Sequence, residues 1–467
     1  MNTSVQFGNY SPRTAPESTD FDITLSLGQV KTFVPMGILN FDNGYENPYF
    51  NFNYTLSGAP LETLNFRILA EDGSMLYDMT YIEAIIVTAS KKSVLEARAK
   101  KEVPLFNFEN PVRSWNYNSI FKEFNLTEPD YTLPGSYGLM WDGFDNDEVF
   151  DSRNFSGKKL KAIITGVKAG KQKTKEIEFF TNNEVVNWTD VKINRKAKRI
   201  DVELRVNLKD GGASGFETVT YRDPLDDPRG PAVRSRKKWQ SIPASEIGRI
   251  GRSPFQAATR SYDQLKQLAI NGLNYHWGRN QNHGFGKFVN ISGVSYQVYM
   301  NAVNVDDDAK AIDDIELMYN TNGDSMRSGN PGTVQDVVSL VGNLISREAI
   351  CYNVGYIKYS NGWGYASEDH ADNEFRDTSA HEIGHTILKA YGGTGYSYGH
   401  KGSTWVVTQS IKSSAPQIPL AGEIDIMPYF NDNVLGNEHF QKNYYTRRVA
   451  AERDVLSLLW LTKLKIQ

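Results

Sequence analysis

The feature that most constrains the fold of this chain is a pair of histidines four residues apart, with a glutamate beside the first. The pair, His381 and His385, lies within residues 378–391, which follow residues able to cap a helix and precede two glycines able to end one. Residues four apart lie on one face of a helix. The spacing therefore predicts a helix that holds one metal ion between two imidazoles, with Glu382 placed to take a proton from a water molecule at that metal.

The ends of this helix are predicted from the residues beside it. Asp377 or Thr378 is expected to cap the N-terminus, and Gly392 and Gly393 are expected to end the helix. The alternative is an ordinary helix with two histidines on its surface. Because the chain has only seven histidines in 467 residues, this spacing arises by chance in roughly one such chain in a hundred. The uncharged residues around the pair also favour a buried metal-binding helix.

A zinc ion that acts in hydrolysis takes three protein ligands and keeps a fourth position open for water. Downstream of the helix, His400 lies in a glycine-containing loop that can fold back beneath it. Glu423 precedes a tight apolar turn, where an acidic residue needs a partner and a metal would supply one. The residues themselves leave both open as the third ligand of Zn2+. The remaining histidines are more typical of structural or surface positions; they are His276, His283, His370 and His439.

Composition excludes several classes of protein. Hydrophobic residues make up 40% of the chain and aromatic residues 12%, which is enough for packed cores and too many for a disordered protein. The net charge of −4 does not indicate a nucleic-acid partner. Cys351 is the only cysteine, which excludes a disulfide framework and a cysteine-ligated metal cluster.

Targeting signals are also absent from the sequence. No apolar stretch is long enough to span a membrane, and the N-terminus lacks the basic start and apolar core of a Sec signal peptide. We therefore expect a protein that is cytoplasmic in the cell that makes it and is secreted, if at all, by another route.

The apolar pattern changes along the chain and predicts a multidomain protein. Short alternations between turn residues indicate an all-β first half, and longer helical periods follow residue 250. The predicted divisions are a loose arm at 1–19, a β-sandwich at 20–182, a linker with an entry strand at 183–250 and an α+β domain at 251–467. The predicted strands are Leu64–Leu69, Leu160–Val167, Ile200–Leu208, Phe288–Ile291, Val294–Ala302, Ile315–Tyr319 and Ile350–Tyr359. The other predicted helices are Tyr262–Tyr275, Thr333–Ile345 and Tyr445–Ile466.

A short motif in the β-rich half resembles a known family. The turn Trp141-Asp142-Gly143-x-Asp145, with a second acidic-glycine turn at residues 71–73, is similar to turns in the immunoglobulin-like domains of flagellar hook-capping proteins. The resemblance covers residues 20–182 and implies an immunoglobulin-like sandwich with one corner tightened by the turn. A sandwich of this kind implies a binding or docking role. An ordinary aromatic-anchored turn implies nearly the same architecture.

The second half resembles metzincin-type zinc metallopeptidases. The histidine pair is followed by Asp425-Ile-Met427-Pro-Tyr429, and in that clan a methionine turn lies under the zinc site. In some members a tyrosine two residues after the methionine leans toward the metal, which is the position of Tyr429. The sequence departs from the clan at its glycine and third histidine, because Leu388 and Tyr391 stand there. The resemblance implies a zincin-type α+β fold and leaves the third ligand in doubt.

The stretch from His381 to Tyr429 also resembles zinc-peptidase effector domains carried on spike proteins of bacterial type VI secretion systems, over residues 185–467. Those domains use a downstream glutamate as third ligand, behind a small β-sandwich adaptor. This resemblance implies Glu423 as the first choice and His400 as the second. It also implies a spike protein and a cognate immunity protein as partners, and action in the periplasm of a target cell.

Two classes of function are consistent with these features. The first is a zinc-dependent peptidase delivered as an antibacterial effector toxin, with Glu382 as general base and the Tyr429 hydroxyl stabilising the oxyanion. Tyr396 and Tyr398 are alternatives for that hydroxyl, or simply pack the helix end. The second is a non-catalytic binding or structural component of a contractile secretion machine with a structural zinc site. Glu382 favours the first class, since a structural site needs no general base. The substrate would be a peptide, a protein or a cell-wall peptide, and the sequence does not separate a peptidase from a cell-wall amidase.

Overall fold

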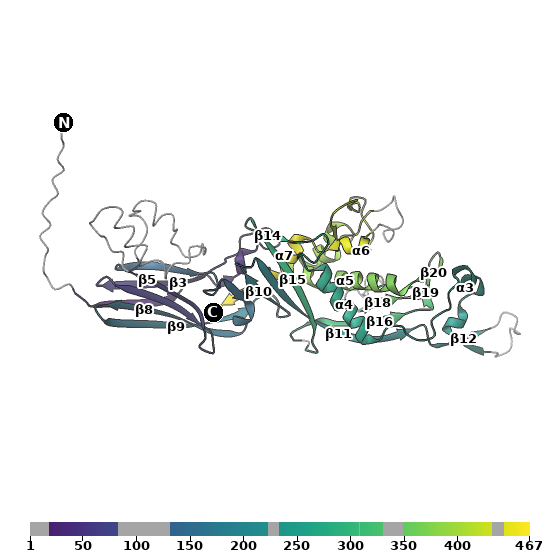
Figure 1. Ribbon diagram of the computed structural model, residues 1–467, viewed down its shortest axis with the longest axis horizontal. Coiled ribbons are helices and arrows are strands. Elements are labelled where there is room, and N and C mark those ends of the chain that lie inside the picture. Colours follow the sequence, from purple (N-terminus) through teal and green to yellow (C-terminus); the bar gives the residue numbers. More distant parts are fainter. Residues whose placement is uncertain (1–17, 83–130, 223–232, 308, 330–348, 432–442) are drawn as a thin grey trace, which may run out of the picture.

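The structure is a computed structural model that describes residues 18–82, 131–222, 233–307, 309–329, 349–431 and 443–467. The molecule is elongated, with the strands of the first half at one end and the helices of the second half toward the other (Figure 1). The expected division into an all-β N-terminal region and an α+β C-terminal region is confirmed. No helix among the described residues is long and apolar enough to cross a membrane.

The N-terminal region consists of two antiparallel sheets that pack face to face. The smaller sheet has the order β1 (Phe21–Leu27), β3 (Phe50–Gly58), β6 (Gly135–Trp141). The larger has the order β2 (Thr32–Phe33), β23 (Leu464–Ile466), β9 (Lys171–Asn183), β8 (Lys158–Lys168), β4 (Thr63–Leu69), β5 (Met75–Ile82). Phe52 of β3 contacts Phe66 and Phe179 of the larger sheet, at ring-centroid distances of 5.2 and 5.6 Å. The period-2 pattern thus places one face of each sheet in a shared core.

Both turns singled out in the sequence of this region are present. The first joins β4 to β5 through Gly73, whose φ of +83° favours glycine. In the second, the indole N–H of Trp141 donates to the carbonyl of Phe144 at 2.7 Å, and the carboxylate of Asp145 accepts from the N–H of Val149 at 2.8 Å. These bonds turn the chain sharply from β6 into β7 (Val149–Asp151).

A seven-stranded sheet is the frame of the C-terminal region. Five strands follow the order β14 (Val289–Ile291), β15 (Val294–Asn304), β11 (Arg199–Ser214), β10 (Thr189–Asn194) and β7. The other two, β16 (Ile312–Asn320) and β18 (Ala349–Asn353), branch from this path, because β16 pairs with both β11 and β18. The long strand β11 pairs in parallel with β15 along its first half and with β16 along its second. Helices α4 (Tyr262–His276) and α5 (Glu368–Tyr398) pack against each other, and against β15 and β18 respectively (Figure 1).

Shorter elements complete this region. They are α3 (Ala244–Ile250), α6 (Tyr444–Arg447), α7 (Glu452–Trp460), the pair β12 (Thr218–Arg222) and β13 (Val233–Lys237), the sheet β17 (Gly323–Asp324), β19 (Gly355–Tyr359), β20 (Gly362–Ala366), and the pair β21 (Ile424–Asp425) and β22 (Arg448–Val449).

Most predicted elements that fall on described residues are confirmed, and two are wrong. The predicted strand Ile350–Tyr359 is interrupted after β18, because Gly355 has φ +74° and redirects the chain into β19. The predicted helix Tyr445–Ile466 is helical only in parts, and its last residues form β23 in the N-terminal sheet. The predicted helix Thr333–Ile345 lies outside the described residues.

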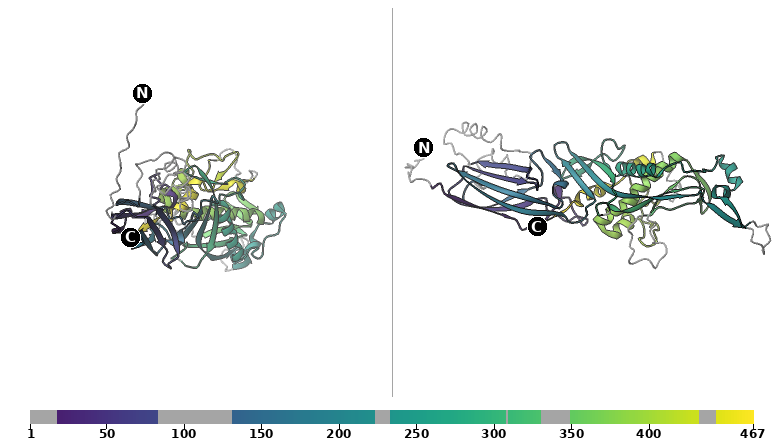
Figure 2. Two further views of the ribbon diagram at one scale, coloured as in Figure 1. Left: turned by 60° about the vertical axis from the view of Figure 1, so that its left-hand side comes forward. Right: turned by 90° about the horizontal axis from the view of Figure 1, so that it is seen from below.

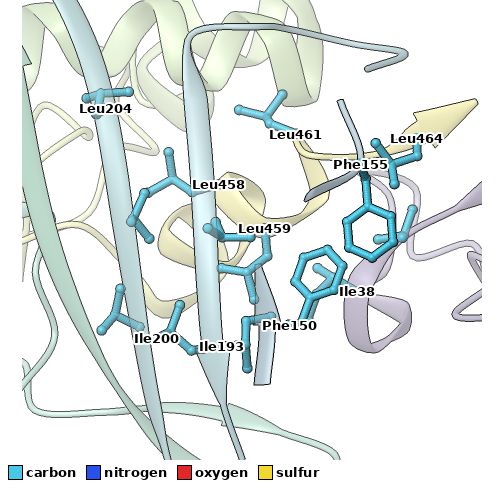
Figure 3. Packing of buried hydrophobic residues seen from close by; sticks show 14 of the residues in the cluster. Ile38, Phe150, Phe155, Ile193, Ile200, Leu204, Leu458, Leu459, Leu461 and Leu464 are labelled. Carbon is cyan, nitrogen blue, oxygen red and sulfur yellow. The ribbon is translucent and has the colours of Figure 1, made fainter. Parts of the chain in front are cut away.

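The two regions share strands and a core, so the predicted boundaries are crossed in both directions. β23, from the end of the chain, pairs with β9, and β7 pairs with β10 of the second sheet. Leu458 and Leu459 of α7 lie against two isoleucines of the second sheet, Ile193 and Ile200 (Figure 3). Further along the chain, Leu461 and Leu464 lie on the side of the core formed by the first region, near Phe150, Phe155 and Ile38. The C-terminus lies between the two regions in both views of the elongated molecule (Figures 1 and 2). One apolar core therefore runs from the first region into the second.

Candidate metal centre

Helix α5 carries the histidine pair and begins earlier than predicted. Its N-cap is Ser367, whose side chain accepts from the N–H of His370, and two acidic residues follow in the first turn. The predicted caps Asp377 and Thr378 lie inside the helix instead. Asp377 has a different partner, since its carboxylate accepts from Nε of Arg448 at 2.6 Å.

The helix is held deep in the C-terminal region by the residues around the pair. Ala380, Ile383 and Ile387 are completely buried. The indole of Trp277, at the end of α4, donates to the carbonyl of Ala380 at 3.0 Å. Packing therefore fixes the rotation of α5 and determines where the imidazoles point.

A glycine break brings the chain back toward the pair. Gly393 has φ 77° and ψ 173°, a conformation open essentially to glycine alone, so the helical path ends there as the sequence predicted. The residues that follow return toward His385, where the ring of Tyr398 stacks at 5.2 Å. His400 and Lys401 then adopt φ values of 46° and 58°, which cost roughly 1–2 kcal/mol each for side chains with a Cβ.

Ion pairs hold this strained loop in place. Lys401 Nζ donates to the carboxylate of Asp454 at 2.6 Å and also to Asp425. Asp454 is fully buried, and its carboxylate accepts a second bond from the hydroxyl of Tyr396. Lys401 therefore ties the loop that carries His400 both to α7 and to the turn that carries Met427.

The structure brings His381, His385 and His400 together. One ring nitrogen from each lies within 4.8 Å of the others, and the ring centroids are 4.7 to 5.3 Å apart. All three side chains are buried, with exposed fractions of 6%, 3% and 2%. A buried group of three histidines could hold a metal ion.

The outer nitrogens of the three rings already have partners. Nδ1 of His381 lies 2.8 Å from the carbonyl of Ile426, Nδ1 of His385 lies 3.2 Å from the hydroxyl of Ser397, and Nδ1 of His400 lies 2.9 Å from the hydroxyl of Thr404. A carbonyl only accepts, so His381 carries its proton on Nδ1 and leaves a lone pair on Nε2. That Nε2 is buried and has no hydrogen-bond partner among the described residues. Such an orphaned acceptor fits a metal ligand whose tautomer is fixed from behind.

Burial keeps the three imidazoles neutral. It lowers the pKa of His381 to about 4 and that of His400 to about 2, and it lowers the pKa of His385 well below its usual range. A neutral ring is the form that binds a metal. The donor set therefore fits a divalent transition metal such as zinc near neutral pH.

The preference for Glu423 as third ligand is not supported by this arrangement. Both oxygens of its carboxylate accept from Arg279, at 2.8 and 2.9 Å. The buried guanidinium of Arg279 supplies the partner that the sequence suggested a metal would supply. His400, the second candidate, occupies the third position beside the pair.

Glu382 and Tyr429 lie on the open side of the group, where both line a pocket of about 560 Å³ together with His381. Burial raises the pKa of the Glu382 carboxyl to about 7, against the opposing charge of Arg327. The ring of Tyr429 lies 3.9 Å from that of His400, centroid to centroid. The site thus combines a buried carboxylate and a phenol hydroxyl with the three imidazoles.

The site also contains two arginines that were not predicted from the sequence. Arg448 Nη2 donates to the carbonyl of Ile426 at 3.0 Å, the same oxygen that accepts from His381. Arg327 lines the pocket together with Tyr429. Neither residue lies in a recognisable motif, and no pattern in the sequence marks them.

The weaker candidates have structural roles in the described part of the chain. His276 is buried, with Nδ1 2.7 Å from the carbonyl of Arg448. His283 accepts from the backbone N–H of Gly286 at 2.8 Å and stacks on Tyr275. His370 lies 3.8 Å from Glu374 at the start of α5, and His439 lies outside the described residues.

Met427 packs directly beneath the helix, against Gly384. A Cβ at Gly384 would lie 2.7 Å from the sulfur of Met427 and 2.8 Å from the ring of Trp277. We expect Gly384→Ala to lower the free energy of unfolding by roughly 1–3 kcal/mol, because the core there has no room for a methyl group.

The matched control is Gly395→Ala in the last turns of the same helix. A Cβ at Gly395 meets nothing within 4 Å, so alanine is expected to leave stability unchanged or raise it by up to about 1 kcal/mol. Urea unfolding of metal-free protein, followed by circular dichroism, measures both variants. Equal stabilities would contradict close packing at Met427.

No protein-family model and no curated protein matches this chain.

Proposed function

We propose that this protein is a zinc-dependent hydrolase of peptide or amide bonds. The observation that carries the proposal is the meeting of three neutral, buried imidazoles with a buried carboxylate on the same helix. Structural zinc sites take four protein ligands, whereas hydrolytic sites take three and leave a position for water. Among the described residues the metal-binding group has three members, and Glu382 stands beside it.

Zinc would be held by His381, His385 and His400. When bound, the ion would lower the pKa of a water molecule to about 7 and polarise a carbonyl oxygen. The protein's own side chains transfer the proton and stabilise the developing negative charge. Glu382 takes a proton from the attacking water and returns it to the leaving amine. The hydroxyl of Tyr429 donates a hydrogen bond to the carbonyl oxygen as negative charge develops there.

The resemblance to metzincin-type peptidases gains support from two features. Met427 packs against Gly384, which lies between the paired histidines in the sequence, as a methionine turn beneath a zinc site would. The clan's third histidine is replaced by Tyr391 in this sequence, and the break at Gly393 returns the chain so that His400 takes up that function. The zincin-type assignment is part of the proposal.

The biological setting is proposed from sequence resemblance. The protein acts as an antibacterial effector toxin in the periplasm of a target cell. The N-terminal region is an immunoglobulin-like sandwich that docks on a secretion spike protein, and a cognate immunity protein protects the producer. The two face-to-face sheets and the Trp141 turn support this part of the proposal.

The decisive variant is Glu382→Gln, which removes the base and keeps the shape of the side chain. We expect the variant to retain about one zinc per chain and to lose roughly 10²- to 10⁴-fold in turnover. Elemental analysis measures the metal, and mass spectrometry of digested peptide and cell-wall peptide mixtures measures hydrolysis. Undiminished hydrolysis by Glu382→Gln would remove Glu382 from the mechanism.

The same pair of proteins tests where the substrate lies. Expressed with an added export signal, the wild-type chain is expected to harm the host and Glu382→Gln is not. Expressed without that signal, neither is expected to be harmful. Equal harm from both proteins would favour the non-catalytic alternative, a binding component of a secretion machine with a structural zinc. Harm only without the signal would keep the enzyme and move its substrate into the cytoplasm.

A further inference from the structure

Two guanidinium groups line the pocket beside the metal centre, and they differ in their partners. Arg448 is buried, and Asp377 neutralises its charge at 2.6 Å. Arg327 is exposed, and among the described residues no carboxylate lies within the 4.0 Å that defines an ion pair. The pocket therefore contains one cation that the described part of the protein leaves uncompensated.

The backbone around Arg327 is held firmly beside β18. The carbonyl of Met326 accepts from the side-chain amide of Asn353 at 2.8 Å, and the hydroxyl of Ser328 accepts from the N–H of Cys351 at 2.9 Å. The N–H of Gly329 donates to the carbonyl of Ala349 at 3.1 Å. Residues 326–329 form no strand, but these bonds hold them alongside β18 and present the Arg327 side chain from a fixed position.

The side chain lines the same pocket as the reaction centre, together with His381, Glu382 and Tyr429. Its positive charge acts on the ionisation of Glu382 and Tyr429. The wall around it mixes apolar and aromatic side chains such as Met326 and Phe430 with polar and acidic ones such as Asn353 and Glu374. A guanidinium at the wall of a pocket interacts with an anion more strongly than one on an open surface.

We infer that Arg327 binds a carboxylate of the substrate next to the scissile amide, so that the preferred substrates are peptides with an acidic group beside the cleaved bond. The guanidinium fork matches the two oxygens of a carboxylate and forms charge-assisted hydrogen bonds with them. The carboxylate has two possible sources, the free C-terminus of a short peptide and the side chain of an acidic residue. This inference rests on the proposed function, because it names the substrate class of the same site.

Three nearly isosteric compounds distinguish these sources. N-acetyl-L-glutamine carries its carboxylate at the chain end, N-acetyl-L-glutamic acid α-amide carries it on the side chain, and N-acetyl-L-glutamine amide carries none. Their dissociation constants are measured by ligand-observed nuclear magnetic resonance on the full chain, once loaded with zinc and once after removal of metal with a chelator. The metal-free arm separates binding at Arg327 from coordination of a metal.

At least one acid is expected to bind roughly tenfold or more tightly than the neutral amide, with or without metal. Arg327→Gln should abolish that preference, Arg327→Lys should retain part of it, and Arg252→Gln should not change it, since Arg252 is exposed and does not line the pocket. The acid that binds identifies the source of the carboxylate.

Equal binding of the three compounds, absence of binding, or a preference that survives Arg327→Gln would overturn the inference. None of these readouts requires hydrolysis, so they fail or succeed independently of the Glu382→Gln test. A preference confined to the zinc-loaded protein would assign the carboxylate to the metal and remove Arg327 from recognition.

Discussion

Loss of the His400 imidazole is expected to release the bound metal, whereas loss of the Glu423 carboxylate is not. His400→Ala removes one of three nitrogens that lie within 4.8 Å of one another, and a two-histidine remnant is a poor zinc site. The fall in zinc affinity should exceed the roughly 10- to 100-fold that follows loss of an outer hydrogen-bond partner. Competition with a chromophoric chelator measures that affinity.

Glu423→Ala is the matched comparison, because both residues lie in loops after α5. Its expected cost is structural, since it leaves the buried guanidinium of Arg279 without its carboxylate. We therefore expect Glu423→Ala to have unchanged zinc affinity and reduced thermal stability. For His400→Ala we expect the larger effect on zinc affinity and the smaller effect on thermal stability. His381→Ala serves as the positive control for metal loss. A larger loss of zinc in Glu423→Ala would restore the glutamate as third ligand.

A chain that starts at residue 183 is expected not to fold, although the sequence predicted a separate β-sandwich domain that ends at residue 182. The cut removes Thr181 and Asn182, which pair with Ile466 and Lys465 in β23. It also exposes leucines of α7 and the following residues that now share a core with Phe150 and Phe155 (Figure 3). Each leucine loses about 1.5–3 kcal/mol when its burial is undone, and a few such losses equal the whole stability of a typical domain, about 5–15 kcal/mol.

The same cut removes a second contact, at the end of the metal-binding helix. The loop around Phe41 packs its ring 4.7 Å from Tyr396, and the carbonyl of Leu39 accepts from the hydroxyl of Tyr391 at 3.1 Å. Soluble yield and the cooperativity of thermal unfolding measure the result, with a chain that starts at residue 18 as the control. Adding residues 18–182 in trans should partly rescue folding. A cooperative, zinc-binding fragment 183–467 would contradict a shared core.

The sequence by itself determined the local elements that carry the chemistry. The spacing of His381 and His385 is a property of one helix, so no distant contact is needed to place the two rings on one face. The glycines after the pair predicted where the helical path breaks, because the conformation of Gly393 is open essentially to glycine alone. Alternation of apolar residues predicted β11 and the hairpin of β14 and β15 for the same local reason.

Only the tertiary structure placed His400, and not Glu423, beside the histidine pair. The choice depends on which side chain finds a competing partner, and that partner, Arg279, lies 144 residues away from Glu423 in the sequence. Arg327 and Arg448 were likewise invisible, because a lone arginine has no periodicity and its role is set by what packs around it. The junction of the two regions follows the same rule. The strand β23 pairs with β9 across more than half of the chain, and no local pattern specifies pairing between segments so distant.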